Sequence, residues 1–151
     1  MKRYYWIYAA WFIGASIGLP ILLEVVRHFS GVDLYSSFVT IAPAMVAAMV
    51  AGMSFVKGRE TAPTSSESWR FARGSLVIAL VFSMLYAAAF FAIFPEVKES
   101  LHGLFEPTML GVMAVILAVV FLIIFLTNRI FFAMGAKNGL KAALRNKAKA
   151  G

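Results

Sequence analysis

Hydrophobic residues along the chain fall into four long blocks that are separated by short polar segments. The blocks cover about residues 4–26, 34–56, 75–94 and 108–132. An α-helix rises about 1.5 Å per residue, so about 20 apolar residues cross the roughly 30 Å hydrocarbon core of a bilayer. The pattern predicts an all-α membrane protein with four transmembrane helices in a single domain, residues 1–151, and a basic cytoplasmic tail at residues 135–151.

The connections between the blocks are short, so neighbouring helices should be antiparallel. We therefore expect two antiparallel hairpins. The basic start of the chain, followed by an apolar run, also resembles a signal peptide. That run is longer than the usual apolar core of a signal peptide, and no clear cleavage site follows it, so we predict an uncleaved first span.

The segment before the third block contains a helix-start signal. Thr64 and Glu67 stand three residues apart, which is the spacing of a capping box. A helix is therefore predicted to begin near Ser65 and to run on into the third span. This helix would place Trp69 at headgroup level, with Arg70 and Arg73 beside the phosphates.

Composition supports the bilayer as the solvent of this chain. Hydrophobic residues make up 62% of the sequence and charged residues only 14%, against about 45–50% and about 25% in a soluble domain. Cysteine is absent. The chain therefore lacks a disulfide framework, a thiol nucleophile and a thiolate metal site.

The distribution of basic residues predicts an orientation. Only Arg27 and Lys98 fall on one side of the predicted spans. The other twelve of the 14 Lys and Arg residues fall on the opposite side, namely Lys2, Arg3, Lys57, Arg59, Arg70, Arg73, Arg129, Lys137, Lys141, Arg145, Lys147 and Lys149. By the positive-inside rule both termini are predicted to be cytoplasmic.

The net charge of +7 is then explained by topology and by attraction to anionic phospholipids, so no nucleic-acid partner is predicted. The predicted lipid and interface residues are Trp69, Arg70, Arg73, Arg129, Lys137 and Lys141. Arg129 stands near the inner end of the fourth span, where its long stem can reach the interface.

Two strips of small residues predict helix packing. Gly14 and Gly18 stand four residues apart in the first span, and the second span carries Ala44, Ala48 and Gly52 at the same spacing. Small residues let membrane helices approach closely. Since hairpin neighbours meet at high effective concentration, we expect the first strip to pack within the chain, with a partner protein as the alternative. The fourth span is bulky on every face, which predicts a helix that faces lipid or docks loosely on another hydrophobic protein.

Few side chains in the spans carry chemistry. Glu24, Arg27 and His28 share one helix face near the outer end of the first span, which suits either a proton or cation site or, as we favour, a local ion pair. His28 and His102 both fall outside, and two histidines without a supporting cluster are a weak signal for a metal or haem. No cofactor is predicted.

Two prolines interrupt the apolar blocks. Pro20 lies in the first span and Pro43 in the second. Broken helices mark the substrate site in some transporters. No polar residue accompanies either proline at mid-depth, so we favour kinks that serve packing.

Residues 47–80 resemble a family of short, uncharacterised bacterial inner-membrane proteins with four spans. In that family a small-rich second span ends in Gly-x-x-Phe, and a basic loop with proline and a downstream glutamate leads into the third span. The residues that fit this pattern are Gly52, Phe55, Arg59, Pro63 and Glu67. The resemblance implies the fold and a location in the bacterial inner membrane, and it implies no activity.

These observations predict a non-catalytic integral membrane protein, an accessory or structural subunit that packs against another integral membrane protein or complex. The alternative is a small oligomeric transporter or channel, which would line its pathway by association of several copies. An enzyme is not predicted, because the sequence offers no recognisable set of nucleophile, base and metal ligands.

Overall fold

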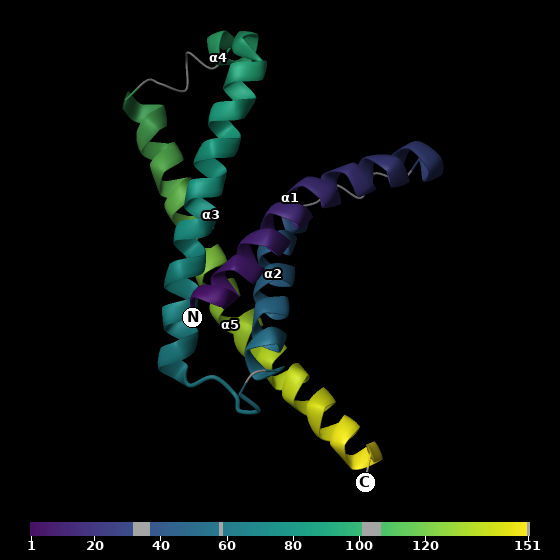
Figure 1. Ribbon diagram of the computed structural model, residues 1–151. Helices are drawn as coiled ribbons and strands as arrows, with labels where there is room; N and C mark the ends of the chain where they lie inside the picture. Colours follow the sequence, from purple (N-terminus) through teal and green to yellow (C-terminus); the bar gives the residue numbers. More distant parts are fainter. Residues whose placement is uncertain (32–36, 58, 101–106, 151) are drawn as a thin grey trace.

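The computed structural model describes residues 1–31, 37–57, 59–100 and 107–150, and all of its regular structure within these ranges is helical. The helices are α1 (Lys2–Ser30), α2 (Ser37–Lys57), α3 (Ser65–Ile93), the short α4 (Pro95–Ser100) and α5 (Pro107–Ala150). In Figure 1, the four long helices meet near the start of α1. They then diverge as two pairs, α1 with α2 and α3 with α5.

Three of these helices are long and apolar enough to cross a membrane. They are α1, α3 and the Met109–Asn146 stretch of α5. A fourth apolar stretch, Ile41–Lys57 in α2, is shorter than the roughly 20 residues of a typical span. Only 6% of the apolar window of each of the three long helices is buried, as expected where lipid is the solvent. The helices thus fit a helical membrane protein.

The predicted start of α3 is confirmed. Thr64 is the N-cap residue, and its side chain accepts a hydrogen bond from the backbone N–H of Glu67. The Glu67 carboxylate in turn accepts from the Thr64 backbone N–H at 2.9 Å. This reciprocal pair satisfies two backbone donors that the first turn of a helix otherwise leaves unpaired.

Pro20 and Pro43 lie inside continuous helices, as expected for kinks that do not break a span. The ribbon of α1 bends along its second half in Figure 1. Because proline lacks a backbone N–H and its ring crowds the preceding turn, a bend without a break is the usual result. At its end α1 closes on Gly31, whose φ of 68° lies in the left-handed region that glycine adopts at little cost.

The fourth long helix differs from its prediction. No break separates the predicted span from the predicted tail, because α5 runs unbroken from Pro107 to Ala150. Its contact with α2 is the most extensive helix contact in the described structure. The expectation of a helix that faces lipid or docks loosely therefore holds for the first part of α5 and fails for its middle.

Buried side chains gather in one part of the bundle, which we call the buried end: residues 4–12 of α1, 44–57 of α2, 65–79 of α3 and 120–140 of α5. The open end comprises residues 13–30, 80–93 and 109–119, whose large apolar side chains are mostly exposed. Aromatic rings fill the buried end, where Phe71 stacks on Phe132 with 4.0 Å between ring centroids. Tyr8 meets Phe71 edge-on, a favourable arrangement of aromatic quadrupoles.

Candidate functional site

A close helix contact joins α2 to α5 through glycines. A Cβ atom added at Gly52 would overlap the backbone of Phe132 and Ala136. One added at Gly135 would overlap the backbone of Met49, and one at Gly139 would lie 3.2 Å from the Cα of Met53. The two backbones are therefore as close as side chains permit, which is the geometry that glycine strips provide in membranes.

Sequence reasoning assigned residues 135–151 to the tail and missed two of these glycines. Gly135 and Gly139 form a Gly-x-x-x-Gly spacing, the same signal that was noted at Gly14 and Gly18. The basic residues around them favoured a location outside the membrane. Spacing alone would have identified the strip, because four residues return a helix to nearly the same face.

Of the predicted packing residues in α2, Ala44 and Ala48 are fully buried and Gly52 is buried against α5. Gly52 packs against α5, whereas we expected the small-residue strip of the first span to find its contact within the chain. The physical reason is that α5 offers its own glycines at the contact, so two strips without side chains meet each other.

Among the described residues, none of another segment packs closely on Gly14 or Gly18, so the expected contact is not found there. A Cβ atom added at either glycine would meet no atom within 4 Å. Gly52 of α2 packs instead against α5. The strip on α1 is left exposed.

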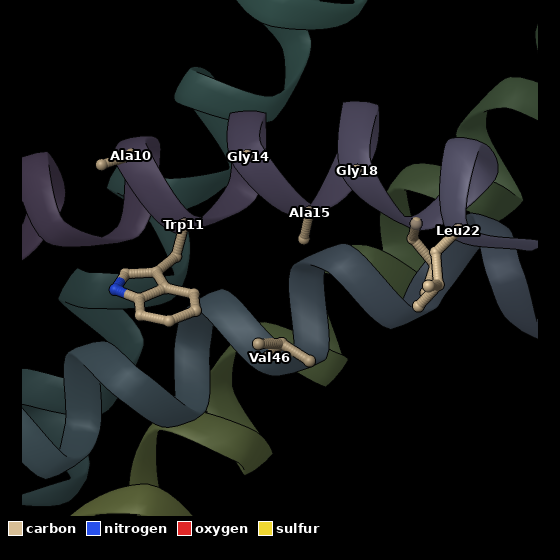
Figure 2. A pocket seen from close by; sticks show the side chains of 8 residues that line it. Ala10, Trp11, Gly14, Ala15, Gly18, Leu22 and Val46 are labelled. Carbon is tan, nitrogen blue, oxygen red and sulfur yellow. The ribbon is translucent and has the colours of Figure 1, made fainter.

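This exposed strip forms the floor of an apolar groove of about 410 Å³, which we call the α1 groove. Its lining residues are Ala10, Trp11, Gly14, Ala15, Gly18, Leu19, Leu22 and, from α2, Val46. Figure 2 shows Trp11 and Leu22 standing at the two ends, with the two glycines between them. From residue 10 to residue 22 the groove extends about 18 Å along the helix.

A hydrogen bond joins α1 to α5 inside the buried end. The side-chain amide of Asn128 donates to the hydroxyl oxygen of Tyr8 at 3.1 Å, and both residues are fully buried. The other amide atom, Oδ1, has no hydrogen-bond partner among the described residues. Polar side chains that bond across helices fix which helices pair, because an unpaired polar atom is costly in an apolar core. The sequence analysis placed neither residue at this contact.

The predicted interface residues lie around the start of α3 and the middle of α5. The Arg129 guanidinium carbon lies 3.9 Å from the centroid of the Trp69 ring, a cation–π contact. The backbone carbonyl of Arg70 accepts a hydrogen bond from the Tyr5 hydroxyl at 2.8 Å. The side chains of Arg70, Arg73, Lys137 and Lys141 are exposed.

A second cap interaction involves Glu67. Arg59 donates to Glu67 Oε1 at 2.6 Å, while Oε2 faces Thr64. The pKa of Glu67 is lowered from its ordinary value, first by the hydrogen bond from the Thr64 backbone and then by Arg59. The loop before α3 is thus tied to its first turn by charge-assisted hydrogen bonds.

At the other end of α1, Arg27 and Glu24 form an ion pair of 2.6 Å with both side chains more than half exposed. His28 is exposed and packs its ring edge on Phe29, and His102 lies outside the described residues. Within the described ranges, no group of three or more His, Cys, Asp or Glu residues is placed to hold a metal ion. The geometry at Glu24 matches the local ion pair that we favoured.

Comparisons of the chain with protein-family models, with curated proteins and with solved structures found no match.

Proposed function

We propose that this chain is a non-catalytic membrane subunit whose α1 groove receives a helix of another integral membrane protein. The observation that carries the proposal is the unfilled glycine strip. A Cβ atom added at Gly14 or Gly18 would meet no atom of another described segment within 4 Å, although the spacing of these glycines suits close helix packing. Gly52 in α2 and Gly135 in α5 form a close contact between their helices, so this chain already contains one example of the contact that the α1 groove invites.

The shape of the α1 groove supports a helix as its occupant. Trp11 and Leu22 give it apolar ends, and Ala15 and the glycines leave its floor flat. A length of about 18 Å matches three turns of a partner helix. In water an exposed apolar strip of this kind would promote aggregation. Within a membrane a second helix can replace lipid at this surface.

The proposal includes the membrane and the orientation. We place the protein in the bacterial inner membrane, with four spans in two antiparallel hairpins and both termini in the cytoplasm. The 12 to 2 division of basic residues supports the orientation, and the resemblance of residues 47–80 supports the location. Reporter fusions at Gly103 and Gly151 would decide it, since Gly151 should report cytoplasm and Gly103 the outside.

The alternative, a small oligomeric transporter or channel, has less support. A pathway needs polar groups that replace water along its length. Glu24 and Arg27 already bond to each other on the surface, and Asn128 is enclosed within the packed core. No chain of described polar side chains joins these two positions.

The test replaces both glycines of the α1 groove, Gly14→Ile and Gly18→Ile. Because open space surrounds them, the purified chain should keep its wild-type thermal midpoint in detergent. The branched side chains should block a partner helix, so a native-gel complex seen in gentle membrane extracts should dissociate. The matched control is Gly111→Ile in α5, where a Cβ atom also meets nothing and the complex should persist.

Two results would contradict the proposal. If the isolated double variant unfolded at lower temperature, the strip would pack within the chain. If Gly111→Ile disrupted the complex as much as the double variant, contact would not be specific to the α1 groove. A complex that contains only copies of this chain would favour the oligomeric alternative.

A further inference from the structure

A second cavity lies between α5 and the start of α3, away from the α1 groove. It measures about 490 Å³ and is lined by Pro63, Ser65, Ser68, Arg129, Met134 and Lys137, among others. We call it the basic pocket. Its two charged lining residues are both cationic, so it differs in kind from the apolar α1 groove.

The spacing of residues in α5 explains how the basic pocket forms. Arg129, Ala133 and Lys137 stand four residues apart and therefore lie on one helix face. The small side chain of Ala133 leaves room between the two cations. The opposite wall comes from residues 62–68, where the capping box fixes the first turn of α3.

The positive charges of Arg129 and Lys137 are available to an external ligand. Within the described residues, neither Arg129 nor Lys137 forms an ion pair with a carboxylate. The nearest structured acid in this wall, Glu67, is bonded to Arg59 and does not line the basic pocket. The guanidinium of Arg129 is held over the Trp69 ring, which reduces the entropy lost when it binds an anion.

Apolar surface continues directly from the basic pocket. Ile130 and Met134 line it on one side and are themselves exposed. Toward the open end, the same face of α5 continues with two further exposed residues, Leu126 and Leu122. The surface would accommodate a ligand with a charged head beside Arg129 and an apolar chain along this stripe. Such a ligand is an amphiphile.

We propose that the basic pocket binds the phosphate of an anionic phospholipid, with one acyl chain lying along the exposed stripe of α5. Arg129 contacts the phosphate through its fork of N–H donors, and Lys137 supplies a second charge. Ser65 adds a hydroxyl at the positive end of α3. A zwitterionic headgroup would bring its own cation beside these two, so the basic pocket selects net negative lipids. This inference is independent of the partner helix proposed for the α1 groove.

The test uses Trp69 as a reporter, because it lies under Arg129. Full-length protein carrying Trp6→Phe and Trp11→Phe retains Trp69 as its single tryptophan. It is reconstituted in phosphatidylcholine vesicles that contain brominated phosphatidylglycerol or, in parallel, brominated phosphatidylcholine. Bromine quenches tryptophan on contact. Phosphatidylglycerol should be preferred over phosphatidylcholine by at least about fivefold. One basic residue near an anionic headgroup contributes about 1 kcal/mol, and this free energy corresponds to a ratio of that size.

Variants separate the basic pocket from general surface charge. Arg129→Gln with Lys137→Gln should bring the preference close to one. The matched controls are Arg145→Gln and Lys149→Gln, which remove the same two charge types from exposed positions outside the basic pocket and should retain the preference. Lys137→Gln alone leaves the Trp69 stacking intact and should lower the preference in part, so the test does not depend on the double variant folding.

Three outcomes would overturn the inference. Equal quenching by both lipids in the protein without pocket substitutions would show that the basic pocket does not select anionic lipids. An equal loss of preference in the control pair would assign it to surface charge. Displacement of the lipid by millimolar soluble glycerol phosphate would show that the ligand is a free phosphate ester and not a membrane lipid.

Discussion

The buried end and the open end of this bundle are built from similarly apolar helices, yet only one of them packs. At the buried end, glycines and alanines in α2 and α5 let two backbones touch, and aromatic rings fill the remaining space. At the open end, α1, α3 and α5 present large aliphatic side chains such as Ile17, Val81 and Val115 to their surroundings. The difference teaches that hydropathy brings a helix into the membrane without choosing its neighbours, because lipid tails are as apolar as leucine.

The largest expected effect comes from making the same substitution at two glycines of α5, one at the buried end and one at the open end. Gly135→Ile at the buried end would drive a branched side chain into the Met49 backbone, and overpacking of this kind costs about 3 kcal/mol. For a chain of this size, the thermal midpoint in detergent should fall by about 10 °C. Gly111→Ile at the open end should leave it unchanged, and equal midpoints for the two variants would remove the contrast between the ends.

A smaller effect is expected from the polar pair inside the buried end. Tyr8→Phe or Asn128→Leu leaves the other partner buried without a hydrogen bond, which costs about 1–2 kcal/mol. The double variant removes both polar groups and should be less destabilised than the sum of the two single variants. Chemical unfolding in detergent measures the cycle. Strict additivity would mean that the hydrogen bond does not couple α1 to α5.

The smallest effect concerns the cap that holds the buried end at the start of α3. The pKa of Glu67 is lowered in the folded state, so its contribution to stability is present above its ordinary pKa and is lost as pH falls through the folded value. Thermal midpoints should therefore drop slightly more below about pH 4.5 in the wild type than in Glu67→Gln. Parallel pH profiles for the two proteins would exclude this contribution.

Local signals in the sequence predicted several elements of the fold correctly. Thr64 and Glu67 specified the start of α3 because a capping box acts within four residues. Pro20 and Pro43 were expected to kink the first two spans, and both lie inside helices. These features depend on neighbours along the chain, so no knowledge of the tertiary contacts was needed.

Contacts between distant segments were predicted poorly. The strip at Gly14 and Gly18 was assigned to packing within the chain, while the equivalent strip at Gly135 and Gly139 was placed in the tail. The two strips have the same spacing and similar flanking hydropathy on one side. The two strips differ only in whether another helix of the chain offers a surface that packs on them. That surface belongs to a distant segment of the sequence.

The candidate sites divide in the same way. Arg129, Lys137 and Trp69 were each predicted to be interface residues from charge and position. Their assembly with Ser65 around one cavity could not be derived, because it requires the crossing of α3 and α5 at a particular register. Likewise, nothing in the sequence near Tyr8 or Asn128 indicates that they meet across 120 residues of chain.

By itself, the sequence determined that this chain is helical and has helices apolar enough for a membrane, and it determined where one long helix begins. Those properties follow from apolar length and from hydrogen bonds between residues three or four apart. Tertiary structure alone decided that the glycines of α5 pack against α2, that the α1 groove stays open and that a basic pocket forms. The reason is steric. In an apolar solvent the gain from packing depends on how closely two particular surfaces can approach, and that distance is set jointly by residues far apart in the chain.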